Sequence, residues 1–212
     1  GIQVNSVNVG IAGDHIRSMR SKGVITINNK DNEITAHDVE RLLEDCQRIM
    51  LPTDQQILHV IPQEFVVDGQ DGINDPVGMS GMRMEAEVHI ITGLVSAAKN
   101  IYRCVERAGY QVADIILEPL ASSYSVLDQE EKEAGVVLVD IGGGTTDVAI
   151  FQDNTIRHTA VIAIAGQKVT DDIRLGLSVL DDQAETLKRK HGESYADMIQ
   201  EDEVITVPGI AG

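Results

Sequence analysis

The chain has 212 residues, of which 42% are hydrophobic and only 3% aromatic, so its core must be built mainly from Val, Ile, Leu and Ala. Asp and Glu number 34 against 17 Lys and Arg, which gives a formal net charge of −17. The acidic excess is spread along the whole chain, so the protein would repel a phosphate backbone or an anionic lipid surface. Binding to nucleic acid and electrostatic docking to membranes are therefore not expected.

The cysteine content and the absence of long apolar runs indicate an intracellular setting. Two cysteines, Cys46 and Cys104, cannot make a disulfide framework, and both are expected in helices as small buried residues. No run of 18 apolar residues and no secretory signal is visible. The chain opens on Gly1 and closes on a strand-like run over 203–207, so we expect a piece of a longer protein.

The first 93 residues predict a small α/β module. Strands are expected at 7–12, 24–27, 56–61, 64–67 and 86–92, with Pro62 as a break and 68–81 as a long loop. Thr35 and Asp38 have the spacing of a capping box, and apolar residues at helical spacing follow as far as Met50. Pro52 is expected to end this helix.

The remaining residues alternate between predicted helices and strands. Helices are expected at 94–108, closed by Gly109, at 120–127 after Pro119, and at 167–177 and 182–191. Strands are expected at 112–117, 136–139, 148–151 and 161–164, and the continuous apolar run at 136–139 predicts burial on both faces. Residues 128–134 are charged and predict a solvated linker, and Asp153-Asn154 predicts a turn.

One motif carries recognisable chemistry: residues 140–147 read Asp-Ile-Gly-Gly-Gly-Thr-Thr-Asp between two strands. Three glycines let a ligand approach the backbone, whose N–H groups can cradle an anion, and Thr145 and Thr146 can add hydroxyl donors. Two carboxylates beside a phosphate make electrostatic sense only with a cation, so Asp140 and Asp147 predict Mg²⁺. The alternative is a glycine-rich β-hairpin with flanking acids.

Two weaker signals lie further along the chain. Ala165-Gly166 precedes a helix, whose N-terminus could approach a phosphate or ribose, although most such turns are only caps. Glu185 and Lys188 share one helix face, and their spacing alone favours an exposed ion pair. The six histidines are scattered without ligand spacing, and neither a Walker-type loop nor a Gly-x-Ser-x-Gly elbow is present in the sequence.

The stretch from Asp140 to Asp147 resembles the second phosphate loop of the actin, heat-shock chaperone and sugar kinase superfamily. The wider chain resembles the bacterial cell-division FtsA family in several segments that occur in the right order. These segments are residues 9–16, 61–65, 76–81, 98–101, 120–127 and 184–188. The resemblance covers essentially the whole chain.

The resemblance implies an α/β fold, namely an actin-like (ribonuclease H-like) ATPase core with an inserted strand-helix-strand-strand subdomain, incomplete at both ends. Residues 1–93 would be the insert, and 94–133 the returning part of the first lobe with the inter-lobe connection. Residues 134–177 would form the core of the second lobe with its phosphate loop, and 178–212 the start of its outer subdomain.

The resemblance also implies a binding site for ATP and Mg²⁺. Gly142, Gly143, Gly144, Thr145 and Thr146 would contact phosphate, with Asp140 and Asp147 at the metal through water. Gly166, Glu185 and Lys188 would lie near ribose and base, and Glu118 is a weak catalytic candidate near the inter-lobe connection. The family's first phosphate loop, adenosine loop and amphipathic membrane helix would lie outside these residues, so this chain alone is expected to bind ATP weakly at best.

The function implied is that of a cytoplasmic scaffold at the inner face of the membrane at the division site. It would bind ATP as a conformational ligand, self-associate, recruit later division proteins through residues 1–93, and link filaments of the tubulin-like protein FtsZ to the membrane. At most it would be a slow ATPase. Two alternatives remain: an actin-like scaffold of pilus or secretion assembly, and an ATPase or kinase on the same fold.

Overall fold

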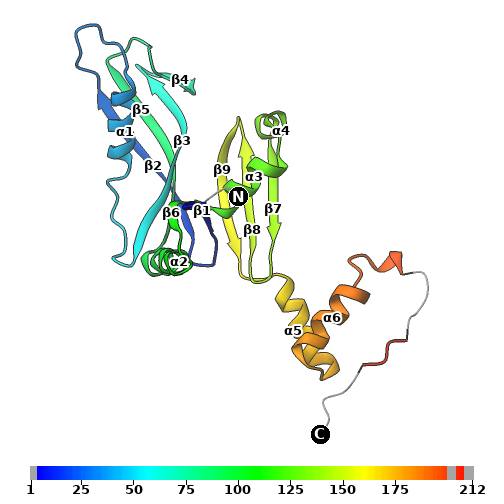
Figure 1. Cartoon of the computed structure of the whole chain (residues 1–212). Helices are drawn as coiled ribbons and strands as arrows, with labels where there is room; N and C mark the ends of the chain where they lie inside the picture. The colour runs from blue at the N-terminus through cyan, green and yellow to red at the C-terminus, as the bar shows by residue number, and fades with distance from the viewer. Residues whose placement is uncertain (1–3, 200–203, 208–212) are drawn as a thin grey trace. The chain divides into compact units, whose positions relative to one another are not determined.

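The computed structural model describes residues 4–199 and 204–207, and it divides into two compact units (Figure 1). The first unit runs to Asp140 and also includes Asp147–Val161. The second unit contains Ile141–Thr146 and the residues from Ile162 onward. Within the described residues, no helix is both long enough and apolar enough to cross a bilayer.

A four-stranded antiparallel sheet covered by one helix forms the expected α/β module. Its strands are β2 (Arg17–Thr26), β3 (Gln55–Val67), β4 (Gln70–Ile73) and β5 (Arg83–Leu94), in the order β2-β5-β3-β4. Helix α1 (Ala36–Cys46) lies over one face (Figure 1) and buries Leu42 and Cys46 in the core of the module. A Cβ on Gly23 of β2 would lie 2.6 Å from the Cys46 sulfur, so a larger residue there would push α1 off the sheet.

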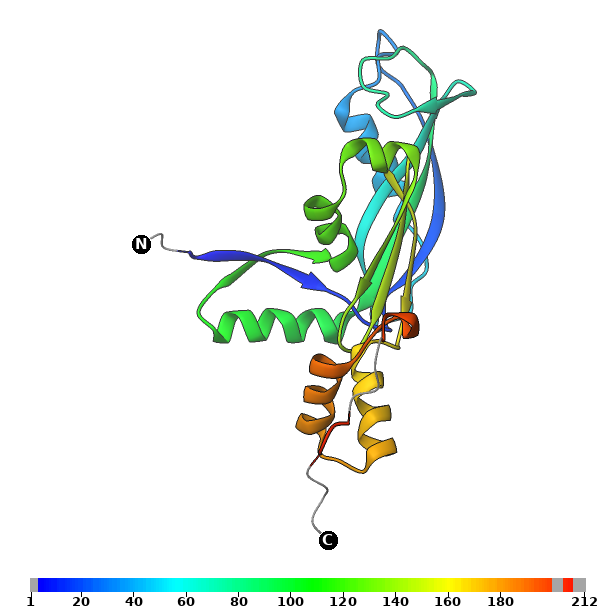
Figure 2. The same cartoon turned by 90° about the vertical axis from the view of Figure 1, so that its right-hand side faces the viewer.

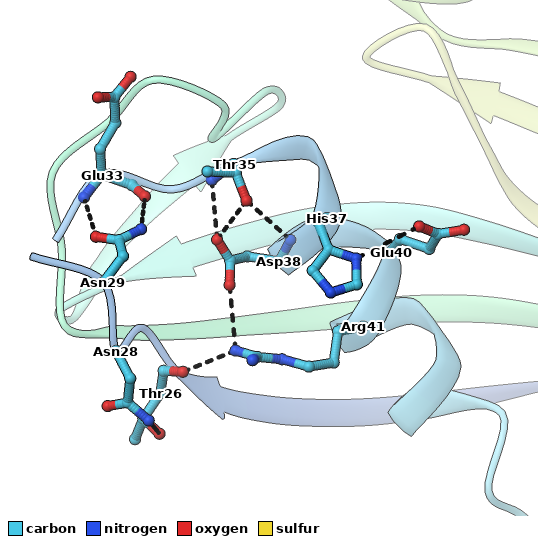
Figure 3. Close-up of polar contacts among 9 residues, drawn as sticks. All are labelled: Thr26, Asn28, Asn29, Glu33, Thr35, His37, Asp38, Glu40 and Arg41. Atoms are coloured by element: carbon cyan, nitrogen blue, oxygen red, sulfur yellow. Dashed lines mark hydrogen bonds and ion pairs between the residues drawn. The ribbon is translucent and has the colours of Figure 1, made fainter.

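The N-terminus of α1 is closed by the predicted capping box (Figure 3). The Asp38 amide donates to the Thr35 hydroxyl, and the Thr35 amide donates to the Asp38 carboxylate at 3.0 Å. Arg41 then joins the Asp38 carboxylate to the carbonyl of Thr26, at 3.2 and 2.8 Å, which ties α1 to the end of β2. The hydrogen bond from Thr35, only partly opposed by burial, lowers the pKa of Asp38.

Four details of this module differ from the sequence-based expectations. Helix α1 ends at Cys46, six residues before Pro52, and the expected loop at 68–81 contains strand β4. Pro62 does not interrupt β3, because the strand shifts its register against β5 between Pro62 and Glu64. Such a bulge tolerates a residue without an N–H. The strand expected at 7–12 does not join this sheet.

That strand, β1 (Ser6–Ile11), instead pairs in parallel with β6 (Gln111–Leu117). Helix α2 (Val95–Arg107) runs beside the pair (Figure 2) and buries Ala98 in a core with Ile11 and Leu117. Gly109 follows α2 with a φ of +87°, as expected for a residue just past a helix end. Cys104 is exposed on α2, so the expectation that it is buried was wrong. Helix α3 (Glu118–Val126) follows β6 directly.

The last sheet of the chain has the order β7-β8-β9, with β7 (Val136–Ile141), β8 (Thr146–Gln152) and β9 (Thr155–Ile162). Both residues of the predicted Asp153-Asn154 turn have positive φ, 52° and 59°, as a tight hairpin requires. Two expectations were wrong here. Residues 128–134 are not an open linker but form helix α4 (Gln129–Ala134), capped by Asp128. The apolar run in β7 is not buried on both faces, since Val137 and Val139 are about half exposed (55% and 50%).

The second unit contains helices α5 (Gly166–Leu177) and α6 (Asp181–His191), which pack on each other, and the short 3₁₀ turn η1 (Ala196–Met198). Both helices begin one residue earlier than expected. Of the expected C-terminal strand, Glu203 lies outside the described residues, and residues 204–207 adopt no strand.

We expect Thr35→Ala to lower the free energy of unfolding by about 1 kcal/mol, because it removes the cap of α1. The folded pKa of Asp38 lies below its unfolded value of about 3.9, so its stabilisation is present above that pH and is lost as the pH falls through the folded pKa. Urea denaturation from pH 7 to pH 2 should therefore show the difference between wild type and variant shrinking in acid. Thr53→Ala, at an exposed threonine, is the control and should change stability by less than about 0.5 kcal/mol.

Candidate functional site

In the second unit, the glycine loop packs against the start of α5 through backbone hydrogen bonds. The Gly142 amide donates to the Thr145 carbonyl at 2.9 Å, which closes the loop on itself. The amides of Gly166 and Gln167 donate to the carbonyls of Gly142 and Gly143, at 3.1 and 2.8 Å. A helix leaves its first N–H groups without partners inside the helix, and here the loop supplies two of the partners. These two N–H groups are therefore engaged by protein, whereas the sequence suggested that this helix start could face a phosphate.

Two of the loop glycines are not explained by the fold. A Cβ on Gly143 or Gly144 would meet nothing within 4 Å, and neither glycine has a positive φ. Alanine would therefore fit the described residues at both positions. Side-chain-free backbone is useful where a ligand must approach closely, so these positions fit the expected phosphate contact.

Gly166 is different, because a side chain there would be in van der Waals contact with the loop and with α6. A Cβ there would lie 3.4 Å from the Gly142 carbonyl oxygen and 3.6 Å from the Lys188 ammonium nitrogen. Thr146, the last residue of the loop, donates its hydroxyl to the carbonyl of Ile164 at 2.7 Å. Thr145 is half-buried beside it. The segment before α5 and the end of the loop are therefore bound to each other.

Glu185 and Lys188 of α6 form part of a polar cluster with the start of α5. The Lys188 ammonium lies 2.6 Å from the Glu185 carboxylate, 2.8 Å from the Thr170 hydroxyl and 3.1 Å from the Gly166 carbonyl. Thr170 is fully buried and donates its hydroxyl to Glu185 at 2.6 Å. The hydrogen bonds from Lys188 and then Thr170 lower the pKa of Glu185. The pair is thus not the simple exposed ion pair that its spacing favoured.

Thr170 was missed by the sequence analysis. It lies one helical turn after Gly166, on the same face of α5, and that spacing was the available signal. The structure brings together Gly142, Gly143, Gly166, Glu185 and Lys188 as expected, and adds Thr170 as the residue that joins the two helices.

The first unit holds the acidic candidates. Asp140 accepts a hydrogen bond from the Ser122 hydroxyl at 2.9 Å, and Asp147 is buried (4% exposed). Burial, followed by the charges of Asp147 and Asp140, raises the pKa of Glu118. Ser122, on α3, was also missed, because nothing in its local sequence separates it from a neighbouring surface serine.

Glu118 packs against β1, since a Cβ on Gly10 of that strand would lie 2.8 Å from the Glu118 Cγ. The mutual repulsion of Glu118, Asp140 and Asp147 is the kind that a divalent cation relieves. Among the described residues, however, no group of three His, Cys, Asp or Glu side chains could hold a metal ion directly.

We expect Lys188→Ala to loosen the contact between α5 and α6, because it removes three interactions of one ammonium group. Hydrogen exchange of the amides in the first turn of α5 should become faster, whereas Lys190→Ala, at an exposed lysine of the same helix, should leave it unchanged. The folded pKa of Glu185 lies below its usual value of about 4.3, so its share of the stabilisation is present above that pH and is lost as the pH falls. If the amides in the first turn of α5 exchanged equally fast in Lys188→Ala and Lys190→Ala, Lys188 would not be the residue that holds α5 against α6.

Comparison with known proteins supports the expected fold and family. Residues 13–92 match the family described as "SHS2 domain inserted in FTSA", and residues 137–212 match "Cell division protein FtsA". The protein of that name from Pseudomonas aeruginosa is 50% identical over 99% of this chain, and that from Escherichia coli K12 is 42% identical over 99%. In both comparisons the match covers 50% of the relative, so the chain spans about half the length of these curated relatives.

A solved structure titled "PilM-PilN type IV pilus biogenesis complex" shares the fold. It is 15% identical, with a TM-score of 0.64 over 89% of this chain and 51% of that one. The chain is therefore an actin-like protein whose core carries an inserted SHS2 subdomain. More particularly, it belongs to the FtsA family of bacterial cell division proteins.

Proposed function

We propose that this protein binds ATP as a conformational ligand and that the glycine loop at 142–146 contacts its phosphates. The observation that carries the proposal is that neither packing nor backbone conformation explains Gly143 and Gly144. Gly166, Glu185 and Lys188 would contact the nucleoside, and they already form one cluster with the loop.

Mg²⁺ would be held from the first unit by Asp140 and Asp147, in part through water. Burial is the main cause of the raised pKa of Glu118, and the charges of Asp147 and Asp140 add to it; that added repulsion is what a cation would relieve. The cation would offset that repulsion. Glu118 would then be the side chain available to orient a water molecule, consistent with at most a slow ATPase.

The loop proposal predicts that replacing Gly143 and Gly144 together by Ala weakens binding of MgATP to the whole protein by at least about tenfold, or about 1.4 kcal/mol. The new methyl groups touch nothing in the described residues, so the midpoint of thermal unfolding without nucleotide should stay the same. Titration calorimetry would measure the affinity.

Gly176→Ala is the matched control, since a Cβ there also meets nothing, yet it lies near the far end of α5. It should bind MgATP like the wild type. Unchanged affinity in the loop variant would remove the phosphate contact from the proposal.

We further propose that the protein works as a division scaffold at the cytoplasmic face of the inner membrane, linking FtsZ filaments to the membrane. Membership of the FtsA family supports this role. Residues 1–93 would carry self-association and contacts with later division proteins, 94–133 would return to the first lobe, 134–177 would form the core of the second lobe, and 178–212 would begin its outer subdomain.

The scaffold role predicts that the full-length protein pellets with FtsZ filaments in ATP and Mg²⁺, and that pelleting is lost when FtsZ lacks its C-terminal tail. Co-sedimentation with both forms of FtsZ measures this directly. Intact ATP binding without pelleting would argue against the division link. Sustained phosphate release at ordinary enzyme rates, about 1–1,000 per second, would argue instead for an ATPase or kinase.

A further inference from the structure

Strand β3 of the insert contacts two other parts of the first unit besides its own sheet. Its residue His59 accepts a hydrogen bond at Nε2 from the Leu117 amide at 3.0 Å. Its residue Gln63 donates from Nε2 to the carbonyl of Ile156 at 2.9 Å. Leu117 is the last residue of β6, and Ile156 lies in β9, so one strand contacts both.

Both side chains lie at irregularities of β3. Its register against β5 shifts between Ile57 and His59 and again between Pro62 and Glu64. A bulge adds a residue to one strand and redirects its side chains. At the second bulge Gln63 is the additional residue, next to a proline that cannot donate to the ladder. The two bulges thus coincide with the two places where β3 contacts other elements.

The contact with β9 is reciprocal and largely shielded from solvent. Arg157 of β9 donates to the backbone carbonyl of Gln63 at 3.5 Å and is held by the Asp153 carboxylate at 2.7 Å. Gln63 is only 8% exposed, and its Nε2 also donates to the carbonyl of Ile61 at 3.3 Å. Loss of the Gln63 side-chain amide would take a buried donor away from the carbonyl of Ile156. Two neighbouring contacts join other strands of the module, β2 and β5, to β9. The Ser18 hydroxyl donates to the Thr159 carbonyl, and His89 lies within hydrogen-bond distance of the Thr159 hydroxyl, each at 3.4 Å.

The contact with β6 lies where that strand becomes α3. A backbone N–H can only donate, so His59 Nε2 must be the acceptor and the ring proton is on Nδ1. The next residue after Leu117 is Glu118, the first residue of α3. His59 therefore fixes the peptide that precedes the acidic candidate.

We propose that β3 is a brace that couples the insert to the β6–α3 junction and to β9, through His59 on one side and Gln63 with Arg157 on the other. By family resemblance, β6 belongs to the first lobe and β9 to the second. Any relative movement of these two elements must then move β3, and a partner bound to the insert must act back on them, since such coupling is reciprocal. The nucleotide-linked part of this inference rests on the proposed function, whereas the brace itself does not.

The brace is tested first without nucleotide, by hydrogen exchange in the whole protein. We expect Gln63→Leu to speed the exchange of β9 amides by about two- to tenfold, the range that corresponds to one net hydrogen bond. Gln70→Leu makes the same chemical change at an exposed residue of β4 and should leave β9 unchanged. Exchange in β9 that is the same in Gln63→Leu and in wild type would overturn the brace.

The reciprocal variant is Arg157→Lys, which keeps the charge beside Asp153 but loses the second arm of the guanidinium. It should speed exchange around residues 61–64 of β3, more than ninety residues away in the sequence, whereas Arg48→Lys on the exposed surface of the insert should not. This conservative change retains a folded protein should Gln63→Leu prove too disruptive. An effect confined to β8 and β9 would show that the two strands are not coupled.

A third experiment repeats the hydrogen-exchange measurement with saturating MgATP. In the wild type we expect exchange in β3 to slow, and in Gln63→Leu we expect that response to disappear while MgATP still binds. Binding of MgATP to the wild type without a change in β3 would overturn the coupling and leave the nucleotide proposal standing. Failure of the wild type to bind MgATP would overturn the nucleotide proposal instead. The two experiments without nucleotide would then test by themselves whether β3 acts as a brace.

Discussion

The antiparallel pairing of β3 with β5 is the constraint on which the first unit depends. β5 lies between β2 and β3, and its residues from Val88 to Gly93 are all buried, so it holds the sheet together from the centre. The same strand leads directly into α2. Because β5 fixes the path of β3, it also fixes where the bulges of β3 direct their side chains. Strand β3, which has two bulges, is thus held in place by the central strand β5.

In the second unit, the start of α5 is a junction between backbone and side-chain contacts. Its first amides are satisfied by the glycine loop, and its Gly166 carbonyl is satisfied by Lys188. All three N–H groups of Lys188 have partners within the protein. A ligand that recruits Lys188 must therefore exchange one of these contacts for its own, so ligand affinity and the packing of α5 on α6 are thermodynamically linked.

Local signals in the sequence were sufficient where the chain itself supplied the partner. The capping box at Thr35, the glycine after α2 and the Asp153-Asn154 turn were all predicted, because each involves residues only a few positions apart. The continuity of β3 through Pro62 could not be predicted from the sequence, since it depends on the pairing of β3 with β5. Of the candidate site, the loop followed from the motif, and the grouping of Gly166, Glu185 and Lys188 followed from the resemblance, whereas the hydrogen bond from Lys188 to Gly166 was not predicted. Thr170 and Ser122 did not, because their roles arise from contacts 15 and 18 residues distant.

The half-exposed valines of β7 have a consequence for how the chain behaves in solution. Val137 and Val139 present β-branched surface on a strand, which favours association between like molecules. A net charge of −17 opposes that association through mutual repulsion. This balance between apolar attraction and charge repulsion acts between folded molecules, so added salt or acid would shift it without any change in the fold. The acidic composition that is expected to repel nucleic acid would therefore also weaken unspecific association through the exposed side of β7.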